Sequence, residues 1–266
     1  MKTLLRRIGS EFILPLLLVG VCITAIGWMQ IPRLEQIRSS SQTTSVTEIR
    51  QGTEAEAARL LLLKKMPSFG FDNLLADWTF LNFTQYFGDT VAREKSDYRL
   101  SPDYFEVILD RDPRFIQAYT FLSTSGSLYA ALPERSTEIM QRALSRLKPD
   151  VPPNGFYGWR QLGVDQLLFV GDSEAARRSF QTAAAWARQS SLPESEQVAQ
   201  FSEQTAAFLA RNPDSKSAQI SAWAMVLNTV PDDRTRKTVI ERIQALGGRV
   251  TQEADGSFRI FAPRQD

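Results

Sequence analysis

The residues of this chain that could do chemistry are mainly carboxylates, because histidine is absent and cysteine nearly so. None of the 266 residues is a histidine, and the one cysteine is Cys22. Zinc sites built on histidine or cysteine, and Ser-His-Asp or Cys-His nucleophilic machinery, are therefore excluded. A carboxylate-dependent enzyme remains as the catalytic alternative.

Two pairs of closely spaced carboxylates are the candidates for acid–base chemistry or metal binding. Asp110 and Asp112 are followed directly by Pro113 and do not complete a calcium-binding loop, so they indicate the end of a helix. Glu194 and Glu196 fall where a helix begins, and acids in a first turn favour the helix dipole. No glycine-rich phosphate loop and no Gly-x-Ser-x-Gly elbow occurs. The sequence therefore predicts that the protein is not an enzyme and has no catalytic residue, cofactor or metal site.

The charge balance argues against a nucleic-acid partner. The chain has 31 Lys and Arg residues against 30 Asp and Glu residues, for a formal net charge of +1. Nucleic-acid binding draws on an excess of positive charge, which this composition lacks. The hydrophobic content of 43% and the charged content of 23% are ordinary for a globular protein of one or two domains.

Residues 12–31, "FILPLLLVGVCITAIGWMQI", form an apolar stretch without a charge. Twenty helical residues at 1.5 Å each reach about 30 Å, which is the thickness of a bilayer's hydrocarbon core. The stretch predicts one transmembrane helix with a cytoplasmic N-terminus at residues 1–11. The cations before it favour that orientation, and they are Lys2, Arg6 and Arg7.

Two alternatives to an anchor remain open for this stretch. A cleaved signal peptide is one, although the run exceeds a usual signal core and no small-x-small cleavage site follows. A lipoprotein modified at Cys22 is the other, although Val21 is bulky for the preceding position. The anchored form predicts a single-pass protein of the bacterial inner (plasma) membrane, or of the thylakoid membrane if the source is photosynthetic. Its C-terminal domain would then be periplasmic or lumenal.

Beyond the apolar stretch the sequence predicts a tether, a helical domain and a hairpin. Residues 32–53 are polar and are typical of a tether. Residues 54–246 carry helical periodicity almost throughout. Residues 247–266 change period around Asp255-Gly256, a dipeptide that favours hairpin turns. The predicted fold class is all-α, with a small C-terminal β-hairpin.

The stretch from 155 to 190 carries a pattern of small and aromatic residues on two successive helices. The first helix has Trp-x-x-Leu-Gly and the second has small-x-x-x-aromatic-x-x-small, with Gly171 and Asp172 between them as C-cap and N-cap. Antiparallel helices approach closely only where side chains are small, so Gly163 and Ala176 are predicted to meet. The repeat-packing residues are Trp159, Leu162, Gly163, Ala176, Phe180 and Ala183.

This pattern resembles the tetratricopeptide repeat (TPR) family, and weaker copies precede it. Tyr119 and Leu122 align with the Trp and Leu of the motif, as do Trp78 and Leu81 further back. The segment "ADWTFLNFTQYFGD" with the downstream "DPRF" is also similar to membrane-anchored TPR proteins of bacteria, including cyanobacteria. The predicted TPR-like helix pairs, stacked as an α-solenoid, cover residues 72–113, 114–150 and 155–190, with a possible degenerate unit at 194–230.

The resemblance implies a concave groove that holds a peptide segment or a helix of another protein and catalyses nothing. The function implied is a membrane-anchored protein–protein interaction scaffold that supports recruitment or assembly of a membrane protein complex. A structural spacer or oligomerisation module without a groove ligand is the alternative. Phe83 and Tyr86 have core packing as an alternative role, and Arg160 a solvated surface role. The implied groove residues are Thr79, Phe83, Tyr86, Thr120, Thr124, Ser127, Tyr157 and Arg160.

Overall fold

The computed structural model divides the chain into two compact units. One unit consists of Met1–Thr53 with Thr90–Ser96, and the other of Glu54–Asp89 with Asp97–Asp266. The structure describes residues 15, 19–31, 46–212, 216–229, 233–253 and 258–263.

The membrane span predicted at residues 12–31 is not found among the described residues. Among the described residues of the predicted span, residues 19–31 are helical. Within the described part of the chain, no helix combines the length and the apolar character needed to cross a membrane. The prediction of a single-pass inner-membrane or thylakoid protein is therefore wrong. Positions 12–14 and 16–18 of the predicted span lie outside the described residues.

The predicted tether is in part a helix. Helix α2 (Val46–Lys65) begins inside the 32–53 segment and runs on without a break into the second unit. Glu48 in its first turn and Lys64 and Lys65 in its last turn complement the helix dipole. The helical pattern that the sequence places after Thr53 therefore extends about two turns further toward the N-terminus. Residues 32–45 lie outside the described residues.

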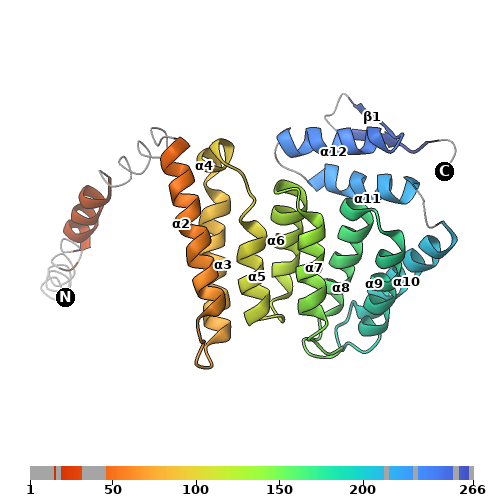
Figure 1. The fold of residues 1–266 in the computed structure, drawn as a ribbon, viewed down its shortest axis with the longest axis horizontal. Helices are drawn as coiled ribbons and strands as arrows, with labels where there is room; N and C mark the ends of the chain where they lie inside the picture. The colour runs from red at the N-terminus through yellow and green to blue at the C-terminus, as the bar shows by residue number, and fades with distance from the viewer. Residues whose placement is uncertain are drawn as a thin grey trace, which may run out of the picture. The chain divides into compact units, whose positions relative to one another are not determined.

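The second unit contains three consecutive pairs of packed helices. In Figure 1 helices α3, α5, α6, α7, α8 and α9 lie side by side in chain order. The first helices of the second and third pairs, α6 and α8, each continue directly into a π-helix. The pairs are α3 (Asp72–Gly88) with α5 (Ser101–Arg111), α6 (Ile116–Leu122) and η1 (Ser123–Tyr129) with α7 (Pro133–Leu144), and α8 (Phe156–Asp165) and η2 (Gln166–Val170) with α9 (Ser173–Ala187). Helix α4 (Thr90–Lys95), between α3 and α5, belongs to the first unit.

The rest of the second unit is a helical layer that ends in a hairpin. Helix α10 packs on α9, and strands β1 and β2 pair antiparallel with Val250 opposite Ile260. Both of these side chains pack on the core that α11 and α12 share. The prediction of a mostly helical chain with a small C-terminal hairpin is confirmed, while its Asp255-Gly256 turn lies outside the described residues. The elements are α10 (Ser195–Arg211), α11 (Lys216–Thr229), α12 (Asp233–Ala245), β1 (Arg249–Gln252) and β2 (Phe258–Phe261).

The third pair is built around the close approach of a glycine to an aromatic ring. Gly163 is buried, and a Cβ added there would lie 3.1 Å from Cε2 of Phe180. Phe180 and Ala176 are both buried in the same cluster on α9. Gly163 thus permits tight packing as predicted, but it faces the Phe180 ring and not Ala176. A ring can fill the space over a glycine more completely than a methyl group can.

The first pair buries the opposite face from the one predicted. Trp78 and Leu81 of α3 were predicted to pack between helices, yet their side chains are 57% and 56% exposed. Phe83 is buried instead, with its ring centroid 4.5 Å from that of Phe105 on α5. Because α3 carries apolar residues on every side, its sequence pattern alone allows either face to turn inward.

Candidate functional site

The groove residues predicted on α3 lie in the core. The side chains of Thr79, Phe83 and Tyr86 are all buried. The Thr79 hydroxyl donates to the Leu75 carbonyl at 2.7 Å, and the Tyr86 hydroxyl donates to the Asp97 carbonyl at 3.1 Å. These three residues are therefore packing residues, and their assignment to a partner-binding groove is corrected.

The groove residues predicted on the second pair divide between surface and core. Thr120 and Thr124 are exposed, and the Thr124 hydroxyl donates to the Thr120 carbonyl at 3.1 Å. Ser127 is buried in η1 and donates to Oδ2 of Asp165 at 2.5 Å. Continuation of α6 as a π-helix changes the register of side chains around the axis, so α-helical spacing misplaces Ser127.

The two groove residues of the third pair lie beside α10. Tyr157 is 38% exposed, and its hydroxyl lies 3.5 Å from Oε1 of Glu194. Nη1 of Arg160 donates to Oγ of Ser202 on α10 at 3.0 Å, and burial lowers the pKa of the guanidinium. Arg160 is thus half-buried and bound within the chain rather than free for a partner.

The most exposed apolar surface on the helix pairs lies on α3. Leu74, Trp78 and Leu81 are spaced i, i+4 and i+7, which places them on one face of the helix. Their side chains are 64%, 57% and 56% exposed. We call these three residues the α3 stripe. Exposed large side chains in such a row are a feature of interaction surfaces, whereas single exposed apolar residues are ordinary.

A buried carboxylate joins the second pair to the third. The pKa of Asp165 rises to about 6 because burial disfavours its charge, while three hydrogen bonds act in the opposite direction. Oδ1 accepts from Ser123 Oγ at 2.6 Å and from Gln161 Nε2 at 3.0 Å, and Oδ2 accepts from Ser127. We call these four residues the Asp165 cluster. Sequence reasoning missed it, although an acid within the apolar run "LGVDQLLF" was a signal.

The other carboxylates considered from the sequence have structural partners. Asp110 accepts from Nε of Arg142 at 3.3 Å, and Asp112 accepts from the backbone N–H of Arg114 at 2.9 Å. Over the residues that the structure describes, no three Asp, Glu or Cys side chains gather in a group that could hold a metal ion. The Asp110 contact links α5 to α7, and the Asp112 contact is local to the turn before α6.

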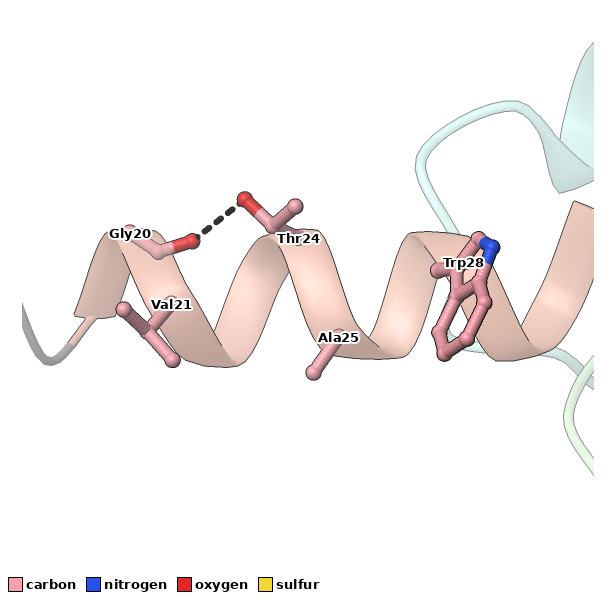
Figure 2. Close-up of a pocket in the computed structure, with 5 residues that line it drawn as sticks. All are labelled: Gly20, Val21, Thr24, Ala25 and Trp28. Carbon is pink, nitrogen blue, oxygen red and sulfur yellow. Dashed lines mark hydrogen bonds between the residues drawn. The ribbon is translucent and has the colours of Figure 1, made fainter.

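A shallow hollow on the helix at 19–31 has one wall only. Its lining residues all come from that helix, and Figure 2 shows Val21, Ala25 and Trp28 along it with Thr24 donating to the Gly20 carbonyl at 2.7 Å. A binding pocket encloses its ligand from several sides. Over the described residues, the hollow is therefore only the side of one helix.

Comparison of this chain with protein-family models, with curated proteins and with solved structures found no match.

Proposed function

We propose that this chain is a protein-interaction module, in which stacked TPR-like helix pairs present the α3 stripe to a helix of another protein. The single observation that carries the proposal is the exposure of Leu74, Trp78 and Leu81 together on α3. Tryptophan and leucine rows of this kind are the anchors through which helices dock on one another.

Three features of the second unit support the TPR-like assignment. Successive helices pack in pairs, and the third pair carries most of the motif of small and aromatic residues. Gly171 adopts φ +80° and Asp172 accepts the Ala175 N–H at 2.8 Å, so the turn between α8 and α9 has the predicted caps. A repeat of this construction usually binds other proteins along an exposed helical surface.

The partner surface that fits the α3 stripe is an amphipathic helix with basic flanks. The stripe extends over eight residues, or about two helical turns, which suits apolar residues spaced i, i+3/i+4 and i+7 on a partner. Asp77 is exposed beside Trp78, and α3 contains no Lys or Arg. Complementary charge on the partner would therefore be positive.

Site-specific photo-cross-linking from position 78 tests the proposal. A photoreactive phenylalanine analogue replaces Trp78 in the full chain, and the same analogue replaces Phe201 as the matched control. Phe201 of α10 is 53% exposed and has no large exposed apolar residue three or four positions away. We expect position 78 to cross-link to an amphipathic helix of another protein, identified by peptide mass spectrometry, and position 201 not to do so.

Two results would contradict this proposal. Cross-linking from position 78 only to a second copy of the chain would favour the oligomerisation alternative. Equal cross-linking yields from positions 78 and 201 would show that the α3 stripe is not a docking surface. Partner binding that persists unchanged in Trp78→Ala would show the same.

A further inference from the structure

A cavity of about 310 Å³ lies on the second unit, where both π-helices meet α11 and α12. Ser127 and Leu128 line it from η1, and Phe169 lines it from η2. Ligand pockets run from about 300 to 1,000 Å³, so this volume suits a small molecule. No part of the proposed interaction surface on α3 contributes to it.

One wall of the cavity is apolar and aromatic. The rings of Phe169 and Trp223 meet edge to face, with centroids 4.9 Å apart and planes at 89°. Trp223 is 3% exposed and belongs to the core shared by α11 and α12, so this wall is fixed in place. Leu128 and Pro133 extend the apolar surface. An apolar side chain of a ligand would be held here by burial.

The rim of the cavity carries one acid and one base. Glu134, in the first turn of α7, and Arg242, in the last turn of α12, both line it and are both exposed. Within the described part of the chain, neither side chain forms an ion pair with the other or with a third residue. Each is therefore available for a ligand group of opposite charge.

The backbone around the cavity is unusual in two ways. Ala131, which lines it, has φ +54°, a conformation that non-glycine residues rarely adopt. Two of the elements that line it, η1 and η2, are π-helices, a form that recurs at functional sites in proteins. Behind the cavity, Ser127 is held by its hydrogen bond to Asp165. Strained backbone persists only where surrounding contacts support it, and it concentrates at binding sites.

We propose that this cavity binds a free α-amino acid with an aromatic or branched apolar side chain. Arg242 holds its carboxylate, Glu134 holds its ammonium group, and the wall of Phe169 and Trp223 holds its side chain. A free amino acid carries an ammonium group and a carboxylate on the same α-carbon, whereas in a residue within a peptide chain both groups are neutral amides. The presence of both charged residues on one small rim thus selects the zwitterion.

Isothermal titration of the full chain with three related compounds tests the ligand class. The compounds are L-phenylalanine, 3-phenylpropionate, which lacks the ammonium group, and phenethylamine, which lacks the carboxylate. We expect L-phenylalanine to bind and each single-charge analogue to bind at least about tenfold more weakly, because one charged group at the rim loses its partner. L-Leucine serves as the branched apolar probe.

Two substitutions then assign the charges. Arg242→Gln is expected to weaken L-phenylalanine binding at least about tenfold. Glu134→Gln is expected to do the same, while leaving the binding of 3-phenylpropionate unchanged. Lys237→Gln, at a cation on α12 that does not line the cavity, is the matched control and should leave binding unaltered. All three side chains are exposed, so circular dichroism should find each variant folded.

The outcomes that would overturn the proposal are distinct from those for the α3 stripe. If both L-phenylalanine and L-leucine fail to bind at millimolar concentration, the cavity is not an amino-acid site. Binding of 3-phenylpropionate as tight as that of L-phenylalanine would remove the role of Glu134, and undiminished binding by Arg242→Gln would remove that of Arg242.

Discussion

Helices α3 and α8 carry the same Trp-x-x-Leu spacing but turn it in opposite directions. On α8, Leu162 is fully buried and Trp159 packs against the core. On α3, Trp78 and Leu81 are both more than half exposed. The two helices occupy equivalent places in their pairs, so the large residues of the motif do not by themselves decide which face is buried.

The small residue explains the difference. The position after the leucine is Gly163 on α8, where it admits the ring of Phe180. On α3 that position is Asn82, whose side chain donates back to the Trp78 carbonyl at 2.6 Å and stays partly exposed. The fully buried small residue of α3 is Ala76, on the face that packs against α5. Helices approach closely along the face that carries their small residues, and this contact decides which large side chains are buried.

The largest expected effect separates the two faces of α3. Phe83→Ala should lower the free energy of unfolding by about 3–5 kcal/mol, because it leaves a cavity among packed aromatic rings. Trp78→Ala should change it by less than about 0.5 kcal/mol, since that side chain is largely in solvent. Urea denaturation of both variants measures the difference. Equal losses would mean that Trp78 is buried as the motif predicts.

The next effect concerns the Asp165 cluster, which has no counterpart on α3. Folding raises the pKa of Asp165 from 3.8 to about 6, so the folded chain holds this proton to higher pH than the unfolded chain. The group therefore favours folding below about pH 4, and this contribution is lost as pH rises to 6. At 1.36 kcal/mol per pKa unit, the loss is on the order of 3 kcal/mol.

Comparison of the parent chain with Asp165→Asn isolates this contribution. Denaturation midpoints are measured from pH 4 to 7. As pH rises, the parent chain should lose stability relative to the Asn variant. The side-chain amide of the Asn variant cannot ionise, so the stability of that variant lacks the pH dependence that Asp165 contributes. A difference that stays constant with pH would mean that Asp165 titrates alike in both states.

A smaller effect tests the close approach on α8. Gly163→Val should cost about 1–3 kcal/mol, because its branches must displace the Phe180 ring. Gly163→Ala should be near neutral, since about 1 kcal/mol of helix propensity offsets a contact of 3.1 Å. Gly52→Val is the control, because a Cβ there meets nothing within 4 Å. Equal tolerance of valine at positions 163 and 52, measured by thermal melting, would refute the contact.

The smallest effect compares the two tryptophans. The Trp159 indole N–H is buried and has no hydrogen-bond partner among the described residues. Trp159→Phe should therefore change the unfolding free energy by only about 1 kcal/mol, because it keeps an aromatic ring at this half-buried position and removes no hydrogen bond. Trp159→Ala should cost several times more, unlike Trp78→Ala. A large loss on Trp159→Phe would show that the N–H is paired.

Local signals in the sequence predicted the helical class, the hairpin and the third pair well. Gly171 and Asp172 cap their helices as predicted, because a left-handed glycine and a capping carboxylate act within a few residues. The candidate site was predicted poorly. Thr79, Phe83 and Tyr86 face the core, and Ser127 is displaced by a π-helix that no sequence period signals.

The sequence alone therefore determined that the chain would be mostly helical with a C-terminal hairpin, and where the turn between the two helices of the third pair lies, because caps, turns and apolar periodicity are local properties. Only the tertiary structure decided which face of α3 is buried and that Asp165 lies among neutral donors between two pairs. It also decided that Glu134 and Arg242 line one cavity. Each of these three features depends on surfaces brought together from distant segments. The sequence of a helix that is apolar on several sides does not indicate which face will pack against a neighbour.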